Sequence, residues 1–161
     1  MAEKSTAVDP AEWDAWKSFI SMRQHLDTAL ERQLQRDAEI STAEYAVLMS
    51  LFESPAKQLR AGELGRALAW EKSRVSHQVS RMEKRGLVER RTCDSDARGT
   101  WIGITPEGSR AALRATREHG HTLRSLFFDL VSPDELATLR AVFDRVQGAA
   151  EPVACEGQGA D

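Results

Sequence analysis

The stretch over residues 71–85 constrains the fold more than any other part of this chain, because it has the pattern of an amphipathic helix with a defined end. Val75, Val79 and Met82 recur at intervals of four and three residues, which places them on one face of a helix. Gly86 follows, and glycine readily takes the left-handed conformation that ends a helix. The sequence therefore predicts a helix over residues 71–85 with its apolar face against a core.

The remaining faces of this helix carry side chains that suit contacts with nucleic acid. Arginine can donate two hydrogen bonds to guanine and glutamine can pair with adenine, whereas hydroxyl side chains often bind phosphate. A polar helix face that only meets solvent is the alternative, and the helix alone does not separate the two. The candidates for base contacts are Arg74, His77 and Gln78, and the candidates for phosphate contacts are Ser73, Ser76 and Arg81.

The distribution of charge favours a polyanionic partner for this region. The chain of 161 residues has a formal net charge of -3, which by itself argues weakly against binding of nucleic acid. Residues 70–100, however, contain eight Lys and Arg side chains against five Asp and Glu, so this segment is at +3 and the remainder at -6. Positive charge is concentrated where the predicted helix lies.

The neighbouring segments extend this helix into a helix-turn-helix with a hairpin. A short helix is predicted over residues 61–68, and Ala69-Trp70 forms the turn between the two helices. After Gly86 the period changes to two, which predicts two strands joined by a loop rich in Asp, Ser and Gly. The predicted strands are residues 87–91 and 100–104, the loop is residues 92–99, and Leu59 is expected to form a one-residue bridge to this sheet. A hairpin that follows a helix-turn-helix is a wing.

The flanking helices are marked by their start signals. Asp9, Ser41 and Ser132 each precede a Glu by three residues, the capping-box pattern, and Pro106 suits the first turn of another helix. The expected helices cover residues 9–40, 41–53, 106 to about 130 with a weak point at Gly120, and 132–147. The first of these carries more apolar surface, beginning with Trp13 and Trp16, than a small winged domain could cover alone. We therefore expect it to form part of a dimer interface.

The sequence thus predicts a mainly α fold with a small β-hairpin wing, in which a winged helix-turn-helix lobe lies between N- and C-terminal dimerisation helices. The expected parts are a disordered N-terminus (1–8), the N-terminal dimerisation helix (9–40), the DNA-binding lobe (41–105), the C-terminal dimerisation helices (106–147) and a disordered tail (148–161).

Several classes of function are excluded by what the sequence does not contain. No apolar run is long enough to span a bilayer and no signal peptide is present, so a cytoplasmic protein without membrane contact is expected. Cys93 and Cys155 lie far apart and show no metal spacing, and His119 and His121 face different directions on a helix, so neither a metal nor a cofactor is expected. No nucleophile with a base and no phosphate loop is found, which argues against an enzyme.

The order of the predicted elements and two sequence motifs are similar to those of a known protein family. The chain resembles the MarR (multiple antibiotic resistance regulator) family of bacterial dimeric winged-helix repressors, from about Trp13 to Val146. The motifs are Lys72-Ser73-Arg74-Val75 with Arg81-Met82-Glu83-Lys84-Arg85-Gly86-Leu87-Val88-Glu89-Arg90, and the wing Asp96-Ala97-Arg98-Gly99 with Ile102-Gly103-Ile104-Thr105-Pro106-Glu107-Gly108.

The resemblance implies a homodimer whose recognition helices enter successive major grooves of palindromic double-stranded DNA, about 34–36 Å apart. It also implies that Arg98 reaches the minor groove and that Asp96 orients it, or a neighbouring Arg, by a charge-assisted hydrogen bond. The family often has a second basic residue near the wing tip, which this chain lacks. Arg90 and Arg91 are therefore expected to help the wing bind DNA.

A small-molecule effector is the further implication of the resemblance, because such ligands typically lie between the dimerisation helices and the DNA-binding lobe. Arg23 is the candidate partner for the carboxylate of a small aromatic or organic acid, and Trp16, His25 and Tyr45 are candidates for the lining of the pocket. The alternatives are an intersubunit salt bridge or a snorkelling side chain for Arg23, and dimer core for Trp16.

Together these observations predict a homodimeric transcriptional repressor that a ligand releases from its operator by a shift between two states. Two alternatives share the fold. Cys93, close to Arg91 at the base of the wing, would make the protein a redox-responsive regulator, or the winged helix would serve protein–protein contact. The dependence of affinity on salt concentration distinguishes DNA binding from protein–protein contact. The affinity of a protein that binds DNA through several cationic side chains falls steeply as the salt concentration rises.

Overall fold

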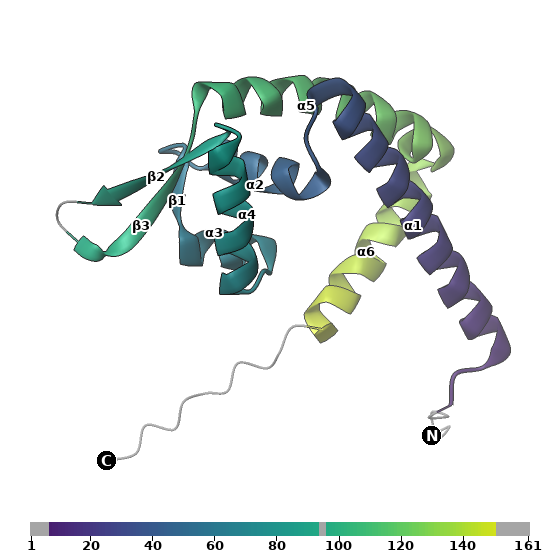
Figure 1. Ribbon diagram of the computed structural model, residues 1–161. Helices are drawn as coiled ribbons and strands as arrows, with labels where there is room; N and C mark the ends of the chain where they lie inside the picture. Colours follow the sequence, from purple (N-terminus) through teal and green to yellow (C-terminus); the bar gives the residue numbers. More distant parts are fainter. Residues whose placement is uncertain (1–6, 94–95, 151–161) are drawn as a thin grey trace, which may run out of the picture. The chain divides into compact units, whose positions relative to one another are not determined.

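The structure of this protein, a computed structural model, describes residues 7–93 and 96–150, and its description of side chains excludes residues 92–99. The chain divides into two compact units, Met1–Leu123 and Arg124–Asp161, and each is described by itself. Along the chain (Figure 1) the elements are α1 (Pro10–Ala38), α2 (Thr42–Glu53), β1 (Gln58–Arg60), α3 (Ala61–Leu68), α4 (Lys72–Lys84), β2 (Val88–Cys93), β3 (Asp96–Ile104), α5 (Pro106–Leu126), a 3-10 helix (Phe128–Leu130) and α6 (Pro133–Ala150). Within the described ranges, no helix is both long and apolar enough to cross a membrane.

The capping signals start the helices as the sequence predicts. The carboxylate of Asp9 accepts the N–H of Glu12 at 2.9 Å, and the carboxylate of Glu12 accepts the N–H of Asp9 at 2.9 Å. Ser41 with Glu44 and Ser132 with Glu135 form the same reciprocal pattern at the start of α2 and α6. Each box satisfies two backbone donors that a helix start leaves without partners, so these boundaries are encoded locally.

The turn between α3 and α4 depends on one close approach and one unusual backbone angle. Ala69 takes a left-handed conformation with φ 51° and ψ 43°, and the N–H of Trp70 donates to the carbonyl of Gly65 at 2.8 Å. A Cβ on Gly65 would lie 3.0 Å from the carbonyl oxygen of Trp70, so a larger residue would require this carbonyl to shift by a few tenths of an ångström. After α4, Gly86 takes φ 70°, which confirms the predicted stop.

The sheet is larger than the sequence predicts. It has three antiparallel strands in the order β1-β3-β2, and β1 pairs over all three of its residues, with Leu59 opposite Ile102. The expected one-residue bridge at Leu59 is therefore wrong, because the neighbouring residues continue the ladder. The expected loop over residues 92–99 is wrong at residues 92–93 and 96–99, since β2 runs to Cys93 and β3 begins at Asp96, and its residues 94–95 lie outside the described residues. A hairpin can continue through polar residues because pairing satisfies its backbone groups whatever the side chains are.

The core lies between α1, α2, α3, α4, the first part of α5 and the sheet, and its residues all belong to the first unit. The predicted apolar face of α4 is confirmed, with Val75, Val79 and Met82 each at most 2% exposed. Three alanines of α5 allow that helix to approach the core closely. The buried apolar residues are Leu34, Ala38, Ile40, Val47, Leu48, Leu51, Leu64, Val75, Val79, Met82, Leu87, Val88, Ile102, Ala111, Ala112 and Ala115.

The last two helices depart from the expected boundaries. The helix expected to run to about Leu130 ends at Leu126 and is followed by a separate 3-10 turn, while Gly120 lies inside continuous α-helix. The tail expected from Gly148 is wrong over its first three residues, because α6 continues to Ala150. One glycine costs a helix only about 1 kcal/mol and the following alanines favour it. The expected disorder of residues 1–6 and 151–161 falls outside the described residues.

Candidate nucleic-acid interface

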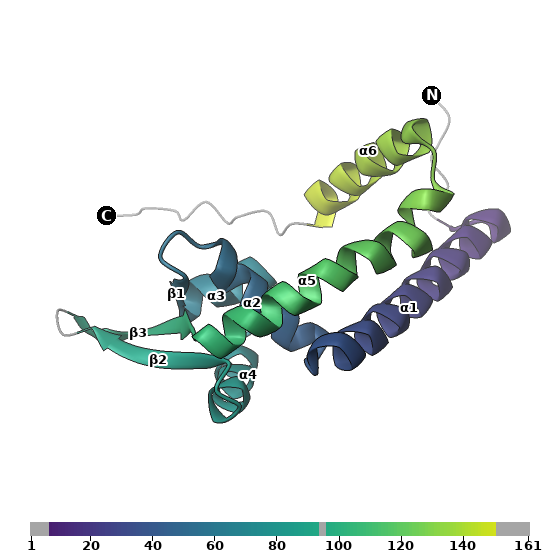
Figure 2. The same cartoon turned by 90° about the horizontal axis from the view of Figure 1, so that it is seen from above.

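The outward face of α4 gathers the predicted contact residues. Figure 2 shows α4 projecting from the sheet, with the β2–β3 hairpin extending to one side of it. The exposed members are Ser73, Arg74, Ser76, His77 and Arg81, and Gln78 is half-buried. Since the opposite face is held in the core, these side chains can meet a partner without any loss of packing. The structure therefore brings together the six candidates that the sequence places on this helix.

Two cations at this face are held in different ways. Arg74 lies over the indole ring of Trp70, with its Cζ 4.2 Å from the ring centroid. Arg90, on β2, forms an ion pair with Glu83 and donates to the hydroxyl of Ser80 at 2.8 Å and to the carbonyl of Ser76 at 3.3 Å. Arg90 thus ties the wing to α4, a role that the sequence does not reveal.

The wing is described in part. Arg91 is exposed and forms an ion pair with its neighbour Glu89 on β2. Asp96 and Arg98 belong to β3 by their backbone, and their side chains, like that of Cys93, lie outside the described residues. The expected contact of Arg98 with the minor groove and the redox role of Cys93 therefore stay predictions.

A groove lies beside the N-terminus of α4, with a volume of about 820 Å³. It is bordered by α3, by the turn at Trp70 and by Thr100 of β3. Three cations, Arg60, Arg66 and Lys72, line it together with Glu63 and Glu71. The surface between the start of α4 and β3 therefore carries cations and anions together.

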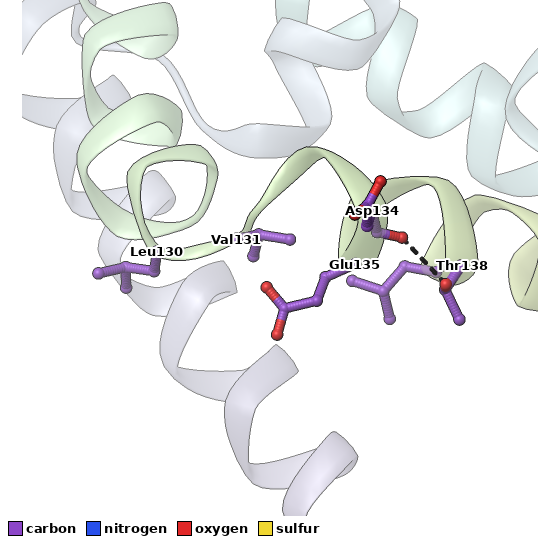
Figure 3. Close-up of a pocket in the computed structure, with 6 residues that line it drawn as sticks. Leu130, Val131, Asp134, Glu135 and Thr138 are labelled. Carbon is purple, nitrogen blue, oxygen red and sulfur yellow. Dashed lines mark hydrogen bonds between the residues drawn. The ribbon is translucent and has the colours of Figure 1, made fainter.

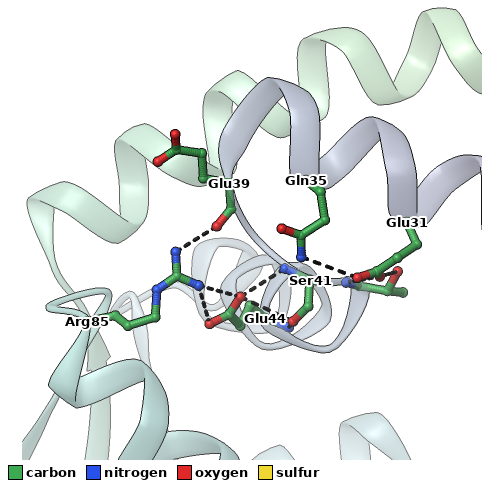
Figure 4. A network of polar contacts seen from close by, with 7 residues as sticks. Glu31, Gln35, Glu39, Ser41, Glu44 and Arg85 are labelled. Atoms are coloured by element: carbon green, nitrogen blue, oxygen red, sulfur yellow. Dashed lines mark hydrogen bonds and ion pairs between the residues drawn. The ribbon is translucent and has the colours of Figure 1, made fainter.

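A polar network fixes the other end of α4 and was not foreseen from the sequence (Figure 4). Arg85, which follows α4, donates from Nη1 to both carboxylate oxygens of Glu44 at 2.7 Å, and from Nη2 to the carbonyl of Glu39 at 2.6 Å. The side chain of Glu44 is 6% exposed and also accepts the N–H of Ser41 at 2.8 Å. Through Arg85, the end of α4 is joined to α2 and to the end of α1.

The same network continues along α1 to Glu31. Its carboxylate accepts the N–H of Thr42 at 2.7 Å and the hydroxyl of Thr42 at 2.5 Å. Partial burial raises the pKa of Glu31, but the hydrogen bonds from Thr42 and Gln35 outweigh it and lower this pKa below its ordinary value. The charged form of Glu31 thus helps to hold the corner between α1 and α2.

The candidate effector residues are not brought together in the described chain. Trp16 and Arg23 are exposed on α1, and His25 has its described polar contacts with Ser21, one turn earlier on the same helix. Tyr45 instead packs on α5, where its ring lies 4.9 Å from that of His119.

His119 connects Tyr45 to α1. Its Nδ1 lies 3.1 Å from Oε1 of Gln33, whose Nε2 donates to Asp37 at 3.0 Å. Because the amide of Gln33 donates to Asp37, its oxygen faces His119 and accepts the Nδ1 proton. Burial lowers the pKa of His119, which favours the neutral ring. This cluster of α1, α2 and α5 was missed because its members are distant in sequence.

Apolar surface is exposed on the helices expected to dimerise. On α1 the side chains of Trp13, Trp16 and Phe19 are 49%, 53% and 39% exposed. In the second unit an open pocket with a volume of about 430 Å³ lies at the start of α6 (Figure 3). Its lining residues are Leu130, Val131, Asp134, Glu135, Thr138 and Leu139.

No group of three or more His, Cys, Asp or Glu side chains suited to a metal ion occurs in residues 7–93 and 96–150.

Comparison with known proteins places this arrangement in a family. The model of the MarR family matches residues 40–100. Sco3205, a MarR family transcriptional regulator from Streptomyces coelicolor solved in complex with DNA, is 34% identical, with a TM-score of 0.88 over 94% of this chain and 95% of that one. AbsC, a MarR family transcriptional regulator from the same organism, is 30% identical, with a TM-score of 0.84 over 90% and 97%.

A third relative is the PcaV transcriptional regulator from Streptomyces coelicolor, solved in complex with its natural ligand. It is 25% identical, with a TM-score of 0.68 over 94% of this chain and 100% of that one. The resemblance seen in the sequence is thus confirmed, together with the mainly helical winged fold. This chain belongs to the MarR family of transcriptional regulators.

Proposed function

We propose that this protein is a homodimeric repressor that binds palindromic double-stranded DNA and leaves it when a small anionic molecule binds. One observation carries the proposal: α4 presents five exposed polar or cationic side chains and the half-buried Gln78, while its apolar face is buried in the core. The similarity to Sco3205, which was solved bound to DNA, supports the same use of this surface. Members of the family are transcriptional regulators, in agreement with the expectation that this chain is not an enzyme.

Dimerisation is proposed because of the apolar side chains that the single chain leaves exposed. Trp13 and Trp16 on α1 and Phe143 and Val146 on α6 are between 42% and 61% exposed. Large apolar patches on a folded chain commonly mark protein–protein contacts. A second copy of the chain would cover them and set two α4 helices at the spacing of two half-sites. Such a dimer would act in the cytoplasm, where bacterial DNA lies.

The DNA-binding proposal predicts a steep dependence on salt. The logarithm of the association constant for operator DNA should fall linearly with the logarithm of salt concentration, by about 0.9 for each phosphate contacted. Arg81→Ala is expected to weaken binding to all sequences alike and to reduce this slope by about one unit, as for a phosphate contact. Fluorescence anisotropy with a labelled duplex, obtained by selection from a random pool, measures both quantities.

Lys17→Ala is the matched control, because Lys17 is an exposed cation on α1 with Asp14 as its partner. It should leave the slope unchanged. A flat salt dependence of the wild-type protein, or no duplex enriched by selection, contradicts DNA binding and favours a protein-interaction module.

The effector proposal centres on Arg23 and is supported by the ligand complex of PcaV. Arg23 is exposed on α1 and forms no ion pair with the described residues of its own chain, so its guanidinium could pair with a carboxylate. Calorimetry with small aromatic acids should give dissociation constants about tenfold or more weaker for Arg23→Ala than for the wild type, the loss of about one charge-assisted contact. Arg32→Ala, an exposed cation later on the same helix, is the control. Equal affinity in Arg23→Ala removes Arg23 from the site.

A further inference from the structure

We propose that Trp70 is a positioning residue that holds the guanidinium of Arg74 ready to read a guanine. This inference rests on the proposed binding of DNA and goes beyond it, because it assigns the orientation of one base contact to a residue outside the recognition helix. The juxtaposition that carries it is the Cζ of Arg74 at 4.2 Å from the centroid of the Trp70 ring.

Arg74 has a different kind of partner from three other arginines near α4. Arg85 is paired with Glu44, Arg90 with Glu83 and Arg91 with Glu89. Among the described residues, Arg74 has neither an ion pair nor a hydrogen bond from its side chain, and its described partner is the indole ring. A carboxylate would neutralise the charge and occupy the N–H donors, whereas an aromatic face does neither.

The indole is itself held firmly. The N–H of Trp70 donates to the carbonyl of Gly65 at 2.8 Å, and the left-handed Ala69 before it fixes the direction of the chain. The side chain is half-buried and packs against the core. Trp70 immediately precedes the N-cap residue Glu71, so its position is set by the turn before α4 begins.

The placement of the Arg74 guanidinium over the Trp70 ring suits the recognition of guanine. All five donors of a guanidinium lie in one plane, so a ring against one face leaves the edges free. Guanine presents O6 and N7 side by side in the major groove and takes two hydrogen bonds from one such edge. An arginine whose guanidinium already lies over a ring loses less rotamer freedom on binding than one that moves freely in solvent. Trp70 should therefore improve discrimination at one base of each half-site and leave the others unaffected.

The test compares discrimination at single operator positions in the full chain. Operator DNA is first selected by the wild-type protein, and Arg74→Ala then identifies the position at which preference for G is lost. At that position, Trp70→Leu should reduce the preference for G over A by about two- to fivefold, the range expected for an exposed cation–π contact. Trp70→Phe keeps a weaker aromatic face and should fall between the wild type and Trp70→Leu.

Two controls separate positioning from general damage. Phe52→Leu removes the ring of another cation–π pair, that with Lys57, and should leave discrimination unchanged at every position. In the Arg74→Ala background, Trp70→Leu should have no further effect on that position, because the two residues act as one pair. Melting temperatures confirm that each variant is folded.

Three results would overturn the inference. One is a loss of affinity from Trp70→Leu and Trp70→Phe that is the same at every operator position, which would give Trp70 a purely structural role. The second is unchanged discrimination in both variants, and the third is an Arg74→Ala protein that has lost no base preference. If the wild-type protein enriches no DNA at all, the proposed function fails and this inference falls with it.

Discussion

Replacing Gly108 by alanine is expected to destabilise the winged lobe by about 3 kcal/mol or more, the upper end of what overpacking costs. A Cβ at this position would lie 2.0 Å from the carbonyl oxygen of Leu87 and 3.0 Å from Cγ1 of Ile104. The carbonyl cannot easily turn away, because it accepts the N–H of Thr105 at 3.2 Å. Relief of the clash would have to move the first turn of α5 away from Leu87, the residue before β2. Urea unfolding at a fixed protein concentration measures the loss.

Gly120→Ala in the same helix is the matched control and should have the opposite sign. A Cβ on Gly120 would meet no atom within 4 Å, and alanine is the better helix former. This variant is expected to be more stable than the wild type by about 0.5–1 kcal/mol. If Gly108→Ala unfolds at the same urea concentration as the wild type, α5 does not approach Leu87 as closely as described.

Arg85→Ala is expected to lower the free energy of unfolding by about 2–3 kcal/mol, because it leaves the carboxylate of Glu44 without its charged partner. The side chain of Glu44 is 6% exposed, so water cannot fully replace the guanidinium, whereas Arg85 itself is 44% exposed and moderates the cost. The carbonyl of Glu39 also loses its donor. Arg85→Lys restores the charge without the paired geometry and should recover part of the loss.

Arg110→Ala is the comparison for this pair. Arg110 and Glu107 form an ion pair in which both side chains are about half exposed. Such pairs contribute little, so this variant should change the free energy of unfolding by less than about 0.5 kcal/mol. Equal losses from Arg85→Ala and Arg110→Ala would contradict the burial of Glu44, and denaturant midpoints of the two proteins decide the matter.

The helices were predictable where their signals are local. The capping boxes at Asp9, Ser41 and Ser132 start helices in the structure, and the helix predicted over residues 61–68 has those bounds. The buried face of α4 followed from the spacing of Val75, Val79 and Met82. A capping box or an apolar period needs only nearby residues, so it can be recognised without knowledge of the fold.

What the sequence did not predict depends on pairing between distant residues. β1 has three residues, too few for a period of two to be recognised, and it exists because β3 offers a free edge. The bond between Arg85 and Glu44, and that between His119 and Gln33, join residues far apart in the chain. Arg90 was predicted, from the resemblance to the family, to help the wing bind DNA. Its ion pair with Glu83 could not be inferred before the hairpin and α4 were placed side by side.

The pairing of β1 with β3 has a consequence for how this lobe forms and how it could be rebuilt. Leu59 and Ile102 face each other across the sheet, and α3, α4 and β2 all lie between them in the chain. Closure of so long a loop costs entropy, so β1 should dock late in folding, after the β2–β3 hairpin has formed from neighbouring residues. A chimera that receives the wing of another family member would inherit a strand that must still match Gln58–Arg60. Exchange of the hairpin together with that short strand is therefore the unit most suited to transplantation.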